Sequence, residues 1–179
     1  MHKIFRVILP IITALCLITA VGCKPDKATS YTPYSGPMLI MENIETHYSD
    51  SAILRVIVRA PVQHEMQNGN RVFPDGVHME FFDESGVKSS DLVSNHGLFE
   101  KEKSLYTVKG NVIIKNLEKN ERLNTEELKW KPDEKKIFTD KFVRIVTEDE
   151  ILTGEGLTSN QDFSNYKILK PSGIFSINE

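Results

Sequence analysis

Residues 77–81 have the sequence Val-His-Met-Glu-Phe, and this stretch decides the fold class of the chain. Apolar and polar side chains alternate along it, which is typical of a β-strand with one face buried and the other in water. Similar stretches open with Val112 and Val143, so the pattern recurs 35 and then 31 residues further on. Turns rich in Asn, Asp, Gly and Lys separate the runs. The sequence therefore predicts an all-β fold without long helices.

This repeat has a physical consequence, because one short unit of strands cannot bury its own apolar face. We expect each opening strand to be followed by a charged turn and two further short strands, with third strands at 103–109, 135–140 and 165–170. Stacked units then share one interior. The predicted fold is an open, twisted antiparallel β-jellyroll of two facing sheets with an apolar groove, built from repeated short-strand units.

The N-terminus has the pattern of an export signal. A short basic leader precedes the uncharged stretch 7–21, which is shorter than the roughly 20 residues that a membrane-spanning helix needs. The stretch ends in small residues that suit a signal peptidase, directly before Cys23, whose thiol can receive a lipid. We interpret residues 1–22 as a lipoprotein signal peptide and Cys23 as the lipidation site. An ordinary signal peptide followed by a coincidental cysteine is the alternative.

Residues 23–37 are rich in proline and small polar residues and lack a hydrophobic period, so they predict a flexible tether. Residues 38–179 are enough for one domain with a sizeable core. The only other cysteine, Cys16, lies in the signal, so the mature chain has no thiol pair. Without Lys3 and Arg6, 20 basic residues stand against 25 acidic ones, and this negative balance argues against nucleic acid as a partner.

Several motifs, taken in order, resemble one known family. They are the segments 73–77, 81–86, 110–112, 123–130, 140–145 and 153–157. Together they resemble the LptC family of periplasmic, membrane-anchored lipopolysaccharide-export components and its OstA-like relatives. The resemblance covers nearly all of residues 38–179, and only the ordered set of motifs is specific. It implies a jellyroll that receives lipopolysaccharide from an inner-membrane ABC transporter and passes it to an LptA-like bridge protein.

The chain departs from the best-known members of that family, which keep an uncleaved transmembrane helix where Cys23 here predicts an acyl anchor. Lys24 is not the aspartate that holds enterobacterial lipoproteins at the inner membrane, so these residues leave the choice of membrane open. The export role places the protein on the periplasmic face of the inner membrane. Its implied partners are lipopolysaccharide, the jellyroll subunits of the transporter and the bridge protein.

A carrier of acyl chains needs an apolar surface and no catalytic group, since each methylene removed from water contributes about 0.8 kcal/mol. The apolar rows of the predicted strands supply such a surface. The predicted lipid-groove residues are Leu54, Val56, Val58, Val77, Met79, Phe81, Val112, Ile114, Leu128, Trp130, Val143 and Ile145. For each of them, a place in a packed core is an equally good interpretation.

An unclosed jellyroll leaves its outermost strands with free backbone groups, and such edges can add a strand from another chain. The resemblance implies that the edge near residues 38–47 meets the transporter and the edge near 166–175 meets the bridge protein. We assign Gly154, Gly156 and Ile168 to this second partner edge. The two glycines indicate either a bulge with a close approach of backbone, or an ordinary turn.

Enzymatic catalysis is not predicted. The acidic pairs lie beside predicted turns, without the apolar surroundings that an acid catalyst needs. The four histidines of the mature chain are widely spaced, and the sequence has neither a nucleophile elbow nor a phosphate-binding loop. We therefore expect no enzyme activity, no metal and no cofactor. The rival interpretation is a lipoprotein β-sandwich that acts as a glycan-binding or structural adaptor module, with its apolar rows sealed as core.

Overall fold

The computed structural model describes residues 33–173, which contain eleven β-strands and two three-residue 3₁₀ helices. The strands are β1 (Leu39–Asp50), β2 (Ile53–Glu65), β3 (Arg71–Phe73), β4 (Val77–Phe82), β5 (Lys88–Ser94), β6 (His96–Glu100), β7 (Leu105–Asn116), β8 (Glu121–Lys131), β9 (Lys136–Val146), β10 (Ile151–Asn160) and β11 (Tyr166–Ser172); the helices are η1 (Lys101–Lys103) and η2 (Pro132–Glu134). The predicted signal peptide, Cys23 and most of the predicted tether lie outside the described residues. Within them, nothing helical is long and apolar enough to cross a bilayer.

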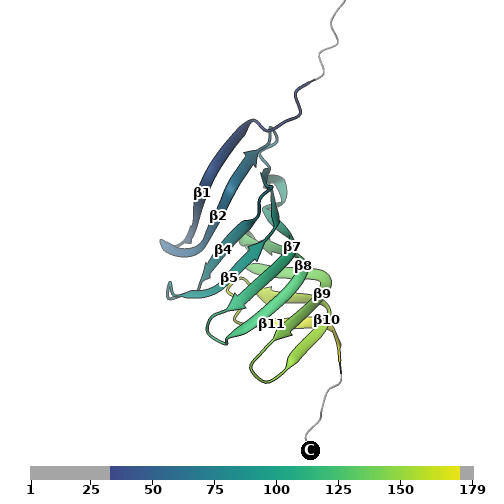
Figure 1. The fold of residues 1–179 in the computed structure, drawn as a ribbon. Helices are drawn as coiled ribbons and strands as arrows, with labels where there is room; N and C mark the ends of the chain where they lie inside the picture. Colours follow the sequence, from purple (N-terminus) through teal and green to yellow (C-terminus); the bar gives the residue numbers. More distant parts are fainter. Residues whose placement is uncertain (1–32, 174–179) are drawn as a thin grey trace, which may run out of the picture. The chain divides into compact units, whose positions relative to one another are not determined.

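All strand pairs in the described residues are antiparallel, and from β7 to β11 each strand pairs with the next strand along the chain (Figure 1). The two long strands β2 and β7 each pair with two short strands. One part of β2 pairs with β4 and another with β3, while β7 pairs with β5 and β6 in the same way. The pairs β4–β5 and β3–β6 complete a closed ring of pairings. Because β3 and β4 lie on one bent ribbon, as do β5 and β6, the sheet is a meander of consecutive ribbons.

The ribbons change direction along one line, which we call the crease. Three positions on it have positive φ in β7 and β10: Gly110 at 74°, Asn111 at 48° and Gly156 at 78°. The register of β7 on β8 shifts between Lys109 and Val112, and that of β9 on β10 shifts between Glu155 and Leu157. An extra residue in one strand of a pair bends the sheet locally. Such irregularities in successive ribbons therefore fold the sheet over itself.

Two buried threonines pair backbone carbonyls that the crease takes out of the ladder. Thr139 Oγ1 donates to the Glu127 carbonyl at 2.6 Å, and Thr125 Oγ1 donates to the Phe142 carbonyl at 2.8 Å. Unpaired buried carbonyls cost free energy, so these hydroxyl groups stabilise the bend.

The crease divides the sheet into two layers that face each other. Layer A comprises residues 44–60, 77–94, 112–125, 143–155 and 170–172, and layer B comprises residues 39–42, 62–65, 71–73, 96–110, 127–140 and 157–168. Phe81 in layer A packs edge-on against Trp130 in layer B, with 5.5 Å between ring centroids. A single cluster of buried side chains fills the space between the layers.

These observations confirm the predicted all-β class and correct two details of it. The two predicted facing sheets are present as two facing layers, but these layers are halves of one continuous eleven-stranded sheet. The separate strands predicted at 103–109 and 135–140 are wrong as boundaries. Each is continuous with the next opening strand, in β7 and in β9. In β7 the Gly110–Asn111 bulge bends the strand, and the pairing with β8 resumes beyond it.

Candidate functional site

The candidate site is the interior between the two layers together with its open side, opposite the crease. Eleven of the twelve predicted groove residues belong to the buried cluster, with 0 to 4% of their surface exposed. Leu54 is the exception and is half-buried. The structure thus brings the predicted row together in one place, and in this state its side chains pack against each other.

The open side runs between the turns of layer A and the turns of layer B, and we call it the seam. Three hollows lie along it, with volumes of about 560, 330 and 120 Å³. Arg71 lines the largest, Tyr48 and Trp130 line the second, and Arg55 lines the second and third. The seam is therefore the place where solvent comes nearest to the apolar interior.

Polar contacts between surface turns close the rest of the seam. Lys135 Nζ in layer B lies 2.6 Å from the Asp50 carboxylate in layer A. Lys119 Nζ donates to the Ser164 carbonyl at 2.7 Å, and Asn116 Nδ2 donates to the Phe163 carbonyl at 2.9 Å. Exposed ion pairs of this kind contribute little stability, so the closure of the seam is weaker than the packing behind it.

The turn at residues 161–165, between β10 and β11, acts as a plug for one end of the seam. Phe163 is fully buried within the core cluster and has a φ of 58°. Its ring stacks on Tyr166, with 5.2 Å between centroids. Burial raises the pKa of the Tyr166 hydroxyl to about 12, and nearby Glu121 adds to the shift. A turn that inserts one aromatic ring into the core can leave it without breaking a strand pair.

The other end of the seam holds a partly buried polar cluster of Arg71, Tyr48 and Tyr106. Arg71 Nη2 donates to the hydroxyl of Tyr48 at 3.0 Å and to that of Tyr106 at 3.2 Å, and the two hydroxyls lie 2.6 Å apart. The guanidinium carbon of Arg71 lies 4.2 Å from the centre of the Phe99 ring, in cation–π geometry. Burial raises the pKa of Tyr106 above its ordinary value, and Tyr48 raises it further.

The predicted partner edge lies on β10 and β11. Gly154 and Gly156 face β11, and Gly156 forms the bulge of β10, which decides against the ordinary turn. A Cβ atom on Gly154 would lie 2.4 Å from the Lys170 carbonyl oxygen and 2.5 Å from Ile168 Cγ2, so this position is also a close approach of two backbones. In the described residues, β11 pairs only with β10 and β1 only with β2. Both outer edges are therefore open to another strand.

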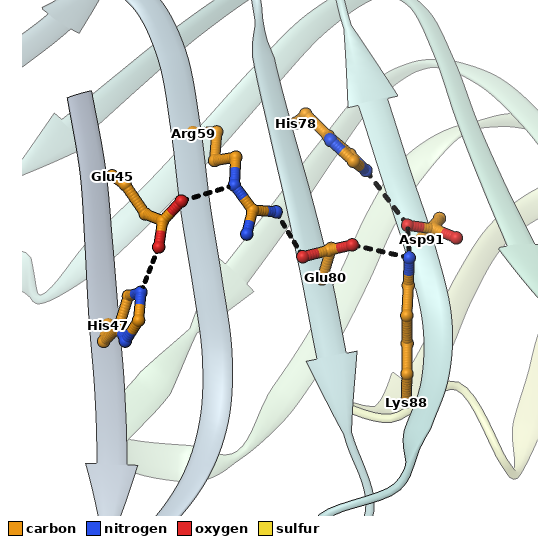
Figure 2. Close-up of polar contacts among 7 residues, drawn as sticks. All are labelled: Glu45, His47, Arg59, His78, Glu80, Lys88 and Asp91. Carbon is orange, nitrogen blue, oxygen red and sulfur yellow. Dashed lines mark hydrogen bonds and ion pairs between the residues drawn. The ribbon is translucent and has the colours of Figure 1, made fainter. Parts of the chain in front are cut away.

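A ladder of alternating charges crosses the outer surface of layer A (Figure 2). From β1 to β5 it runs through Glu45, Arg59, Glu80, Lys88 and Asp91. Arg59 Nε lies 2.7 Å from Glu45, and Lys88 Nζ lies 2.6 Å from Glu80. Lys88 and Arg59 together hold the pKa of the Glu80 carboxyl at about 2. Opposite charges on adjacent strands fix the register of the edge strand β1.

The same ladder contains one group of metal-ligand types. The ligand atoms of His78, Glu80 and Asp91 lie within 4.8 Å of one another. The Lys88 ammonium lies 2.6 and 2.7 Å from the two carboxylates, where a bound cation would sit. We therefore interpret the group as part of the ladder.

Sequence reasoning missed Arg71, Tyr106 and Phe163. Arg71 and Tyr106 sit on strands at inward positions, but a charged residue in a short segment reads as a surface residue. Phe163 is an isolated aromatic residue in a polar turn, and that contrast was the available signal for it.

The fold and the site define a meandering, two-layered all-β protein with an apolar interior and two open edge strands. The comparisons then give the family. The family model described as "Lipopolysaccharide-assembly, LptC-related" matches residues 7–171, which is most of the chain, so the chain belongs to the LptC family. None of the curated proteins compared with the chain matches it. Membership assigns the protein to lipopolysaccharide transport in the cell envelope, in a family of transport and binding components that is not known for enzymatic activity.

Proposed function

We propose that this protein binds the acyl chains of lipopolysaccharide between its two layers and passes the molecule along a chain of similar domains. The observation that carries the proposal is the contrast between the apolar interior and the few polar contacts that close the seam. The interior is a continuous apolar cluster, whereas the seam is closed by a few polar contacts between turns and is hollowed along its length. Parting the seam exposes hydrocarbon to a lipid at little electrostatic cost.

The two open edges support a place between two partners. Backbone groups on the outer sides of β1 and β11 are available for strand addition, and exposed apolar side chains accompany them at Leu39, Ile40 and Leu169. In the proposed function, the jellyroll subunits of the inner-membrane ABC transporter dock at β1 and deliver lipopolysaccharide. An LptA-like bridge protein docks at β11 and receives it. Acylation of Cys23 holds the domain at the periplasmic face of the inner membrane.

Photo-crosslinking tests the proposal. A photoreactive amino acid at Met79 or Phe81 points into the interior, and the same group at His78, which directly precedes Met79 on β4, points outward. We expect lipopolysaccharide adducts from the two inward positions and none from His78. The same pattern of adducts at all three positions, or none at any, would contradict an interior lipid site.

The second candidate is a sealed β-sandwich that serves as a glycan-binding or structural adaptor module. The observation that favours it is the near-zero exposure of the predicted groove residues. In that case the domain excludes an environment-sensitive apolar dye that a carrier takes up, and it keeps this behaviour when lipopolysaccharide is added.

A further inference from the structure

Arg71 is an unusual residue for the inner side of a β-sheet. It lies on the same face of β3 as Phe73, which is 1% exposed in the core. Glu65 is its partner in the β2–β3 register, so the two side chains leave the sheet on the same side. Among the described residues, however, Arg71 forms no ion pair with Glu65 or any other carboxylate. Its guanidinium turns to the two tyrosine hydroxyls and the Phe99 ring instead.

This arrangement leaves hydrogen-bonding capacity unused. A guanidinium carries five N–H donors, and only Nη2 of Arg71 has partners in the described part of the chain. The hollow beside it, of about 560 Å³, is also lined by Lys101, so two cations face one acidic residue there. Positive charge without a carboxylate partner, at the edge of an apolar interior, suits the anionic group of an amphiphile.

The next hollow along the seam contains hydrogen-bond donors without partners. Trp130 is 2% exposed and Arg55 is half-buried, and both line this hollow. The indole Nε1 of Trp130 and Nε of Arg55 are buried without a hydrogen-bond partner. Both are donors only. Unpaired buried donors are costly, so a ligand rich in acceptor oxygens gains binding free energy at this side of the seam.

We propose that Arg71 binds a phosphate group of the transported lipid at the mouth of the interior, so that the acyl chains enter beside Phe99 and Tyr106. This inference rests on the proposed function and adds the chemistry by which the site selects an anionic lipid. A planar fork of donors matches phosphate oxygens in a bidentate manner, which a lysine at the same position does not reproduce.

The test uses the full chain in detergent micelles, with bisphosphorylated lipid A, its dephosphorylated counterpart and inorganic phosphate as probes. The readout is the emission of Trp130, the only tryptophan in the sequence, whose ring stacks 5.0 Å from Tyr106. We expect Arg71→Gln to weaken binding of the bisphosphorylated lipid about tenfold and to leave the dephosphorylated lipid unchanged. The affinity of Arg71→Lys for the bisphosphorylated lipid should lie between that of the unaltered chain and that of Arg71→Gln. Arg144→Gln, on an exposed position of β9, is the matched control for net charge.

The possible outcomes separate the two proposals. Equal losses for both lipids, or no loss for either, refute the phosphate site while the carrier function stands. If inorganic phosphate binds as tightly as the lipid and in an Arg71-dependent way, the site recognises free anions and not a lipid headgroup. If the unaltered chain binds neither lipid, both proposals fail. Arg71→Lys keeps the charge and thus decides the question if Arg71→Gln does not fold.

Discussion

Asn116 gives the sharpest test of the seam, because its side chain forms hydrogen bonds to two turns, the β7–β8 turn and the turn at residues 161–165. Nδ2 donates to the Phe163 carbonyl at 2.9 Å, and Oδ1 accepts from the backbone N–H groups of Glu118 and Lys119, each at 2.9 Å. Asn116→Asp keeps the acceptor and thus the β7–β8 turn. It replaces the donor by a carboxylate oxygen that faces a carbonyl oxygen. The substitution therefore removes the hydrogen bond to the Phe163 carbonyl and leaves the other contacts of residue 116 in place.

The expected magnitude follows from the burial of this contact. Asn116 is 3% exposed and Phe163 is fully buried, so the lost hydrogen bond and the unpaired carbonyl together cost about 2 kcal/mol. If that cost falls on local opening of the turn, the open state becomes roughly 30-fold more populated. Amide hydrogen exchange at residues 161–165 should accelerate by about this factor, while exchange in β4 and β5 stays unchanged. Uptake of an environment-sensitive apolar dye should rise with it.

Asn124→Asp is the matched control, since Asn124 lies on the neighbouring strand β8 and faces outward. It introduces the same charge without touching the plug, so exchange at residues 161–165 should remain at the level of the unaltered chain. Two results refute the reasoning: unchanged exchange at the plug in Asn116→Asp, or faster exchange there without any change in dye uptake. The second result would mean that the turn opens but does not guard the interior.

Two further changes test the ladder and the close approach of β10 to β11. Glu80→Gln should lower stability at neutral pH by up to about 3 kcal/mol, because the folded-state pKa of Glu80, about 2, lies below the usual 4.5. That contribution is fully present above pH 4.5 and is lost as the pH falls towards 2. The free energy of unfolding, measured by urea denaturation, should therefore depend less on pH in this variant than in the control Glu126→Gln, which changes an exposed residue. Gly154→Ala should loosen β11 by about 1 to 3 kcal/mol, because the added Cβ meets the Lys170 backbone; limited proteolysis should then cut β11 sooner than in Thr158→Ala, and equal rates would argue against a tight approach there.

Alternation of apolar and polar residues was sufficient to predict the strands and the buried row. Val77, Met79 and Phe81 follow that period, and all three are in the core. The crease could not be predicted in the same way, because Gly110 and Asn111 have the composition of a turn. Only the pairing of β7 with β8 on both sides of them shows that the strand continues. Local sequence does not distinguish a bulge from a break when partner strands decide the outcome.

In the candidate site, too, some residues could be predicted from local sequence and others could not. The apolar interior could be predicted because each of its members obeys a local pattern. Arg71 could not, because its inward place depends on Phe73 two residues later, on Tyr48 from β1 and on Tyr106 from β7. Phe163 likewise lies far in sequence from Asn116, which fixes it. Residues that act through such distant partners leave no period in the sequence.

The order of the ribbons has a consequence for assembly. In the described residues, each ribbon forms backbone hydrogen bonds only with its predecessor and its successor, so an inner ribbon is paired on both sides and a terminal one on a single side. The number of ribbons is therefore not fixed by any closure of the sheet at β1 or β11. A foreign segment laid against β11 meets the same hydrogen-bonding pattern that β11 offers to β10, and adds a twelfth strand by the rule that placed the eleventh. The sheet can therefore be extended at this edge by one strand at a time, and the added strand can belong to a different polypeptide chain.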